Sequence, residues 1–392
     1  MRIAALSGGV GGARFLRGLL AALAQPARTS TRGPGAVDPE TVDPDPVDEV
    51  VVVGNTADDV TLHGLRVCPD LDSVMYTLGG GSDDERGWGR AGESSAVAGE
   101  LGRYLAAAGT PPDWFTLGDL DLATHVVRSR VLADGGTLTA ATELLCRRWS
   151  PGVRLLPMTD DRVETHVVVD AADVEPDGAS VRSPLAAGLA GPGERALHFQ
   201  EWWVRHHARP PARRIAVAGA GAATPAPGVV EALTGADVVL LPPSNPVVSL
   251  GAVLAVPGVR AALRATAAPV VGVSPVVGGA PVRGMADACL RALGVPTTAA
   301  AVAELYADVL DGWLVDPADA PAAGGAGDGG AGDGGAGDGG PLVRAEPLLM
   351  TTPADAARIA RASLDLAERV RTLDLRSRRT ASVPAAHAAL VA

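Results

Sequence analysis

The sequence contains few cysteines, few aromatic residues and no long hydrophobic run. Its three cysteines, Cys68, Cys146 and Cys289, lack the paired spacing of a disulfide framework or a zinc site, which is typical of proteins in the reducing cytoplasm. No apolar run approaches the roughly 18 to 20 residues that a membrane-spanning helix needs. The first apolar run stops at glycines, so we expect a strand there rather than a signal peptide. These absences predict a cytoplasmic protein without a membrane segment.

A positive surface is also missing from the chain. There are 33 Lys and Arg residues against 45 Asp and Glu residues, which gives a formal net charge of −12. Nucleic acids and anionic membranes bind positive surfaces, so neither is an expected partner. With 47% hydrophobic and 20% charged residues, the 392-residue chain is typical of a globular protein with one large domain or two closely joined ones.

The N-terminus has the order strand, glycine-rich turn, helix. An apolar strand is followed by four glycines, Gly8, Gly9, Gly11 and Gly12, and then by the helical pattern FLRGLLAALA. The amino end of a helix offers unpaired N–H groups and a positive dipole end, so the pattern favours binding of a phosphate or nucleotide. It spells neither GxGxxG nor a P-loop, which needs a Lys. The alternative is that the glycines only allow close packing of strand and helix.

A second apolar strand, residues 50–53, leads into an acidic stretch. Four carboxylates follow within fifteen residues: Asp58, Asp59, Asp70 and Asp72. Open α/β sheets bind ligands at the carboxyl ends of their strands, and carboxylate oxygens suit Mg²⁺. On an extended PDLD segment Asp70 and Asp72 would face the same side and could share a metal ion, with Asp59 or Asp58 as the third ligand. A solvated acidic loop is the alternative.

Two later strands also end in polar turns. Ser244 and Asn245 lie between prolines after an apolar run, and Ser274 and Gly278 follow the next apolar run. Turns at the carboxyl ends of parallel strands face the crevice where the strand order of a doubly wound sheet reverses. We therefore expect these residues to lie at the same edge as the acidic stretch.

Strand and helix patterns alternate along the chain. The predicted fold class is α/β, a doubly wound, mostly parallel Rossmann-like sheet with a smaller helical or mixed substrate-binding part. We expect one domain over residues 1–375, a smaller lid or substrate subdomain over 88–210, and a tail over 376–392. The Pro- and Asp-rich stretch 26–49 is a predicted flexible insertion, and the GGAGD tract at 322–340 is a predicted disordered loop.

Ten ordered sequence blocks resemble one known family. They include SGGVGGARFLRGL, NTADD, HGLRVCPDLDSVMYTLGGG, PDWFTLGDLDLATHVVR, HFQEWWVR, PPSNPVVSLGAVLAVPGVR and SPVVGGAPVRGMAD. In this order, up to about residue 370, they resemble the 2-phospho-L-lactate transferase family (CofD/FbiA) of coenzyme F420 biosynthesis. The forms HFQEWWVR and HGLRVCPDLD are most similar to its actinobacterial branch.

The resemblance implies a Mg²⁺-dependent transfer onto the deazaflavin FO. The donor would be a guanosine diphospho compound that carries a lactyl or an enolpyruvyl group. The terminal ribityl hydroxyl of FO would attack the phosphorus next to the three-carbon acid, and GMP would leave. The actinobacterial branch implies the enolpyruvyl donor and dehydro coenzyme F420-0, although no motif separates the two donors. A homodimer is implied as well.

Roles for the candidate residues follow from this resemblance. Asp72 and Asp59 are the candidate catalytic residues, because a carboxylate could take the proton of the attacking hydroxyl. The candidate metal ligands are Asp58, Asp59, Asp70 and Asp72. The residues expected to bind the donor or FO are Gly8, Gly9, Gly11, Gly12, Asn55, Asp72, Trp88, Thr116, Asp119, Ser244, Asn245, Ser274 and Gly278.

Within that set, Trp88 and the segment 116–121 are expected to border the deazaflavin, and Asp72 to contact its ribityl chain. Arg128 and Arg283 are candidate phosphate clamps. Two other functions stay open. A non-catalytic nucleotide-sugar-binding regulator would keep the glycine turn but could lack the four aspartates. An NAD(P)-dependent oxidoreductase would need GxGxxG and an acidic residue for the ribose about 20 residues further on. The sequence has no GxGxxG and no such acidic residue outside the predicted insertion.

Overall fold

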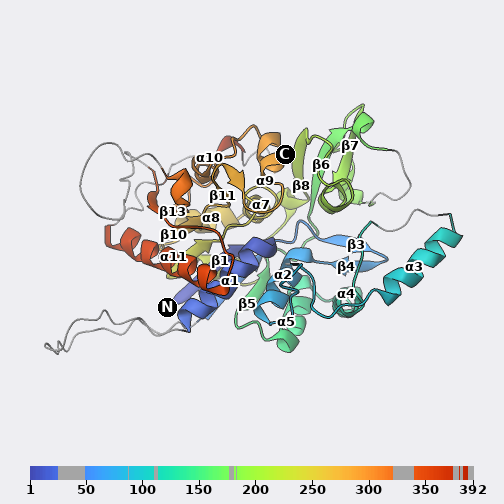
Figure 1. Ribbon diagram of the computed structural model, residues 1–392, viewed down its shortest axis with the longest axis horizontal. Coiled ribbons are helices and arrows are strands. Elements are labelled where there is room, and N and C mark those ends of the chain that lie inside the picture. The colour runs from blue at the N-terminus through green and yellow to red at the C-terminus, as the bar shows by residue number, and fades with distance from the viewer. Residues whose placement is uncertain are drawn as a thin grey trace.

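The computed structural model describes residues 1–24, 49–86, 88–109, 114–175, 181, 183–320, 340–373, 379 and 383–386 (Figure 1). All of the predicted insertion 26–49 except Glu49, all of the predicted disordered loop 322–340 except Gly340, and most of the predicted tail lie outside these residues. Within the described part, no helix is long and apolar enough to cross a membrane.

A seven-stranded parallel sheet forms the centre of the fold, in the order β14-β13-β10-β9-β1-β2-β5. Its strands are β1 (Arg2–Ser7), β2 (Glu49–Gly54), β5 (Arg154–Pro157), β9 (Val238–Leu241), β10 (Val270–Val273), β13 (Gly312–Val315) and β14 (Leu342–Ala345). Ala4 of β1 is in register with Val51 on one side and Val239 on the other. The strand order reverses at β1, which confirms the predicted doubly wound α/β fold.

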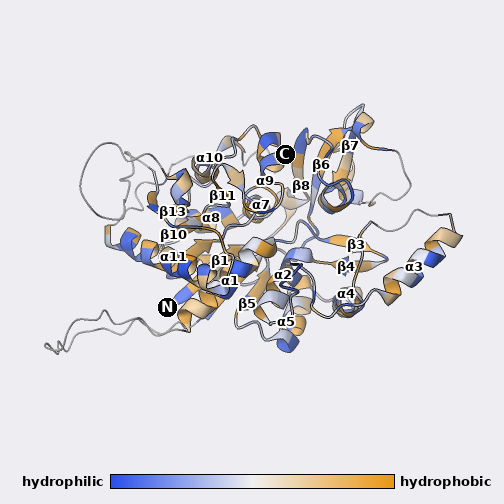
Figure 2. Ribbon diagram, in the orientation of Figure 1, coloured by the Kyte–Doolittle hydropathy of each residue, from blue (hydrophilic) through white to orange (hydrophobic). Residues whose placement is uncertain are grey.

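Helices cover both faces of this sheet (Figure 1). They are α1 (Gly9–Leu23), α2 (Pro69–Leu78), α5 (Leu138–Trp149), α6 (Val229–Thr234), α7 (Leu250–Ala255), α8 (Val259–Ala265), α9 (Ala286–Ala292), α10 (Ala299–Glu304) and α11 (Pro353–Leu373). Hydrophobic and hydrophilic residues alternate around α11, as expected for a helix that packs with one side (Figure 2). Gly18 lets α1 approach α11 closely, because a Cβ there would lie 2.3 Å from the carbonyl carbon of Ala356.

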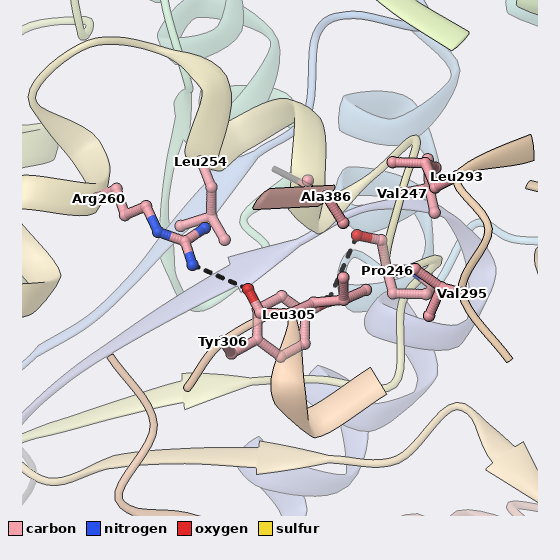
Figure 3. A pocket seen from close by; sticks show the side chains of 10 residues that line it. Pro246, Val247, Leu254, Arg260, Leu293, Val295, Leu305, Tyr306 and Ala386 are labelled. Atoms are coloured by element: carbon pink, nitrogen blue, oxygen red, sulfur yellow. Dashed lines mark hydrogen bonds between the residues drawn. The ribbon is translucent and has the colours of Figure 1, made fainter. Parts of the chain in front are cut away.

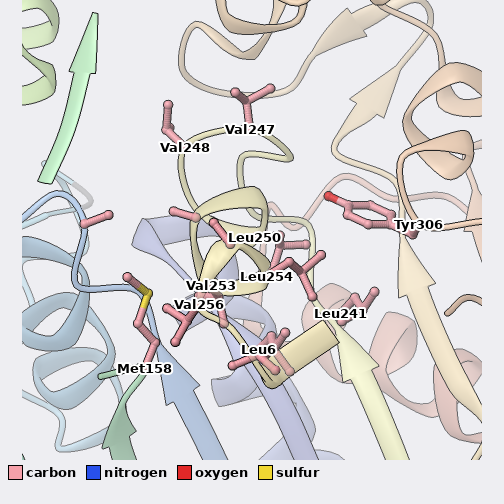
Figure 4. Packing of buried hydrophobic residues seen from close by; sticks show 14 of the residues in the cluster. Leu6, Met158, Leu241, Val247, Val248, Leu250, Val253, Leu254, Val256 and Tyr306 are labelled. Carbon is pink, nitrogen blue, oxygen red and sulfur yellow. The ribbon is translucent and has the colours of Figure 1, made fainter. Parts of the chain in front are cut away.

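Alternate residues of the central strands enter two separate cores. Ile3 and Ala5 of β1 pack with residues of α1, α2 and α11. Ala4 and Leu6 face the other core, where Leu6 packs with Val253 and other residues of the α7–α8 region (Figure 4). Since both faces are buried, the strands read as continuous apolar runs, as parallel strands do.

A smaller antiparallel sheet, β7-β6-β8, packs beside the carboxyl edge of the central one. Its strands are β6 (Glu164–Asp170), β7 (Glu194–His198) and β8 (Arg214–Ala218). Other elements are the hairpin β3 (Val60–Leu62) and β4 (Leu65–Val67), the helices α3 (Ala96–Ala107) and α4 (Asp119–Ala133), and the pair β11 (Val276–Val277) and β12 (Ala280–Pro281). The two sheets alternate along the chain. Strand β5 of the central sheet lies inside the predicted range 88–210, and strand β8 of the small sheet lies beyond it.

Candidate active site

The turns after β1 and β9 are joined at the point where the strand order reverses. The Ser244 hydroxyl accepts a hydrogen bond from the Gly8 N–H (3.1 Å) and donates one to the Gly8 carbonyl (2.8 Å). A Cβ on Gly12 would lie 2.2 Å from the Ser7 hydroxyl oxygen, and one on Gly11 would lie 2.6 Å from a backbone oxygen of the β9 turn. These glycines are therefore needed for close packing, the alternative that the sequence left open.

Asn55 fixes the turn that follows β2. Its Oδ1 accepts from the Ala57 N–H (3.0 Å), and its Nδ2 donates to Asp70 Oδ2 (2.9 Å) and to the Val248 carbonyl (3.3 Å). Asn55 is fully buried. It thus ties the acidic turn, residues 55–59, to α2 and to the segment before α7. The structure places Asn55 in the framework of the site.

Asp70 and Asp72 do not lie on an extended segment, so the geometry predicted for them is wrong. Pro69 begins helix α2, and both aspartates lie in its first turn. Proline is favoured at the first position of a helix and acids in its first turn, a start signal that the sequence contained. Two positions along a helix differ by about 200° in direction. Accordingly, Asp70 contacts Asn55 and Gly9 N–H, whereas Asp72 contacts Arg128.

The four predicted aspartates fall into two pairs with different charge environments. Asp59 Oδ2 lies 3.2 Å from Arg66 and accepts a hydrogen bond from the Cys68 thiol (2.9 Å). Asp72 is ion-paired with Arg128, which is 1% exposed and therefore not free to clamp a phosphate. Both carboxylates are buried, and each has a cation beside it.

Asp58 and Asp70 lack such partners. Both are buried, and among the described residues neither forms an ion pair. Burial, followed by the charges of Asp70 and Asp59, raises the pKa of Asp58 well above its usual value. Burial raises the pKa of Asp70 to about 6. Two buried carboxylates near each other without a cation form a site of uncompensated negative charge.

Several buried polar atoms around this pair have no hydrogen-bond partner. They are the Oδ1 atom of Asp59 and the hydroxyls of Ser7 and Thr56. Hard oxygen donors next to uncompensated carboxylates fit a hard cation such as Mg²⁺. No three His, Cys, Asp or Glu side chains within the described ranges are gathered to hold a metal ion. A cation at Asp58 and Asp70 would therefore need further oxygen ligands from water or substrate.

A second buried cluster surrounds Asp72 and was not found from the sequence. His125 lies 3.7 Å from Asp72 and 3.8 Å from Asp121, and the Tyr76 hydroxyl donates to Asp121 (2.6 Å). Burial lowers the pKa of His125 to about 4, so this imidazole is neutral at neutral pH. The spacing of Asp121, His125 and Arg128, which places them on one face of α4, is the sequence signal that could have revealed it.

Other predicted ligand residues form hydrogen bonds that hold the turns in place. Asn245 Oδ1 accepts from the N–H groups of Val247 (2.9 Å) and Val248 (3.2 Å). The Ser274 hydroxyl bonds to the backbone of Val276, and Gly278 N–H donates to Asp319 (2.7 Å). These contacts shape the turns in which the three residues lie.

The residues predicted to border the deazaflavin have different surroundings. Trp88 is 55% exposed and its ring stacks under Arg86, with 5.5 Å between the guanidinium carbon and the ring centroid. Asp119 caps α3 by accepting from the N–H groups of Ala96 and Val97 (both 3.0 Å). Thr116 lines an apolar cavity of ≈ 110 Å³ between α3 and the β3–β4 hairpin.

A smaller pocket lies behind the turn of Ser244 and Asn245 (Figure 3). Its volume of ≈ 10 Å³ suits about one water molecule. Tyr306 donates to the Pro246 carbonyl (3.4 Å), and Arg260, paired with Asp308 (2.9 Å), donates to the Leu305 carbonyl (2.8 Å). The residues that line this pocket support the turn, and the pocket is too small for a nucleotide.

Comparison with known proteins identifies the family. The model of the family described as 2-phospho-L-lactate transferase CofD matches residues 3–325. A phosphoenolpyruvate transferase of Thermobifida fusca is 53% identical over 94% of this chain and 98% of its own length. One of Kitasatospora aureofaciens is 52% identical over 95% of this chain and 99% of its own.

Among solved structures, a Bacillus halodurans protein is similar over 82% of both chains, with 14% identity and a TM-score of 0.45, a likeness too distant to say anything about function. The family model covers most of the chain, and the relatives match nearly all of it at about half identity. The chain therefore belongs to the 2-phospho-L-lactate transferase CofD family.

Proposed function

We propose that this transferase moves an enolpyruvyl-phosphate group from a guanosine diphospho donor to the ribityl hydroxyl of FO, releases GMP and forms dehydro coenzyme F420-0. Relatives named phosphoenolpyruvate transferase support the enolpyruvyl donor over the lactyl donor, because they match nearly the whole chain. A Mg²⁺ requirement, a homodimer and a cytoplasmic location are part of the proposal.

The observation that carries the proposal is the uncompensated pair Asp58 and Asp70 at the edge where α/β sheets bind ligands. Mg²⁺ in phosphoryl-transfer sites is commonly held by one or two carboxylates plus the phosphates of the substrate. Asp58 and Asp70 would hold the ion here. When bound, it would neutralise charge on the donor phosphates.

The protein's own groups would position the reactants and accept a proton. Asp72 Oδ1 is held by Arg128, whereas its Oδ2 is buried without a partner. That free oxygen is the proposed acceptor for the proton of the attacking hydroxyl. Asp59 is the second candidate, since Arg66 and the Cys68 thiol hold its Oδ2 and its Oδ1 has no partner.

The test is a reaction of the purified protein with FO, Mg²⁺ and either the enolpyruvyl or the lactyl guanosine donor. We expect mass spectrometry to show GMP and a phosphodiester of FO, with faster turnover of the enolpyruvyl donor. Binding of the donor without product would support the regulator alternative. Faster turnover of the lactyl donor would reverse the assignment of the three-carbon group.

A further inference from the structure

The back of the acidic turn is attached to the small antiparallel sheet through two backbone carbonyls. The Thr165 N–H of β6 donates to the Ala57 carbonyl (2.6 Å). On the neighbouring strand β7, the Nε2 of His198 lies 3.2 Å from the Asp59 carbonyl oxygen. The turn that carries Asp58 is therefore held from behind by two adjacent strands.

The contacts of His198 fix which ring nitrogen carries the proton. Its Nδ1 accepts a hydrogen bond from the Gln200 N–H (3.2 Å), so the proton of the neutral ring lies on Nε2. Nε2–H then donates to the Asp59 carbonyl, which has no proton to give. His198 is 1% exposed, and the two contacts leave the ring one orientation.

A neighbouring histidine holds the ring of His198 in place. His166 is in register with His198 across the β6–β7 pair, and the two rings meet edge to face with centroids 5.5 Å apart. His166 Nε2 lies 3.1 Å from Glu164, which also accepts from Arg162 (2.7 Å). The support behind the acidic turn thus continues to the surface of the small sheet.

The charge of the hydrogen-bond donor at position 198 affects the charge of the site. Arg66 already compensates Asp59, so the negative charge of the turn that remains is that of Asp58. A cationic side chain at position 198 would satisfy the Asp59 carbonyl but would also weaken the attraction of the turn for a metal ion. A neutral imidazole N–H orients the carbonyl and leaves that charge intact.

We propose that His198 is a positioning residue of the transferase site, whose Nε2–H fixes the Asp58–Asp59 turn in the orientation that binds the metal-bearing donor. The proposal rests on the proposed function. Side chains that orient groups around metal sites typically contribute 10-fold to 100-fold in metal affinity or activity. His198 acts through the backbone of the turn and does not touch the reactants.

Two substitutions separate positioning from packing. His198→Gln places an amide nitrogen at the reach of Nε2 and keeps the donor to Asp59. His198→Asn reaches only as far as Nδ1 and keeps the contact with Gln200 N–H but loses the one to Asp59. His207→Ala, at an exposed histidine nearby, is the control.

The first measurement is amide hydrogen exchange of residues 55–60 in the metal-free protein without substrate. We expect faster exchange in the Asn variant and near-wild-type exchange in the Gln variant and the control. The second is the Mg²⁺ concentration for half-maximal turnover, which should rise roughly 10-fold or more in the Asn variant only. Equal behaviour of the Gln and Asn variants in both measurements would show that His198 only fills space.

The exchange experiment also keeps this inference separate from the proposed function. If the wild-type protein turned over neither donor, the proposed function would fail, and the exchange of residues 55–60 would still decide the role of His198. Long-range ¹H–¹⁵N spectra of the wild-type protein provide a check that needs no variant. A proton on Nδ1 of His198 instead of Nε2 would overturn the inference.

Discussion

The ion pair of Asp72 and Arg128 should be among the costliest contacts in the protein to break from one side. Both side chains are buried, and Arg128 also donates to the Arg66 carbonyl (3.2 Å). Arg128→Met would leave the Asp72 carboxylate without a counter-charge. Removal of one partner of a buried pair costs about 3 to 5 kcal/mol, because the remaining charge stays desolvated. We expect a loss of this size in the free energy of unfolding at pH 7.5.

Urea denaturation of four proteins measures this loss as a double-mutant cycle. They are the wild type, Arg128→Met, Asp72→Asn and the double variant. The double variant should lose less than the sum of the single ones, since no uncompensated charge remains in it. The loss in Arg128→Met should also shrink toward pH 5, where an unpaired buried carboxyl takes up a proton. Additive losses, or a cost below about 1 kcal/mol for Arg128→Met, would refute a strong buried pair.

Four further predictions follow from the site and from its surroundings. Asp58→Asn should lower turnover roughly 100-fold or more without destabilising the metal-free protein, because it removes an uncompensated buried charge; loss of stability in urea would contradict this. EDTA should stop turnover of the wild type, and turnover that survived it would remove the Mg²⁺ requirement. Burial would raise the pKa of Glu164, but hydrogen bonds from His166, Ser183 and Arg162 lower it from 4.5 to about 2. Glu164 therefore contributes about 3 kcal/mol to the free energy of unfolding above pH 4.5, and this contribution is lost as the pH falls to about 2. The free energy of unfolding should decrease less with falling pH in Glu164→Gln than in the wild type. Parallel decreases in the two proteins would refute this prediction. Gly18→Ala should cost about 1 to 3 kcal/mol of stability, because its Cβ meets the backbone of α11, whereas Gly99→Ala on α3, with open space around it, should cost nothing.

The sequence predicted the fold well because its local signals agree with one another. The apolar run from Val50 to Val53 is a central strand, and the glycine turn leads into α1 at the reversal of strand order, as expected. Continuous apolar runs separated by polar turns identify parallel strands regardless of distant contacts.

The pairing of charges could not be predicted in the same way. Arg128, the partner of Asp72, is 56 positions away and approaches only through the packing of α4. No local pattern therefore shows that Asp72 is compensated and Asp70 is not. The direction of Asp70 and Asp72 was within reach, because Pro69 followed by acids marks the start of a helix.

The bond between Gly8 and Ser244 connects positions 236 residues apart, and it has a consequence for the order of folding. One edge of β1 is covered by β2 soon after synthesis, but the other edge must wait for β9. At a synthesis rate of 5 to 20 residues per second, the interval between the synthesis of β1 and that of β9 is roughly 10 to 50 s. During this time an unpaired edge of the central strand is exposed to other chains. The turn that joins Gly8 to Ser244 therefore forms late, after the chain has been synthesised as far as β9.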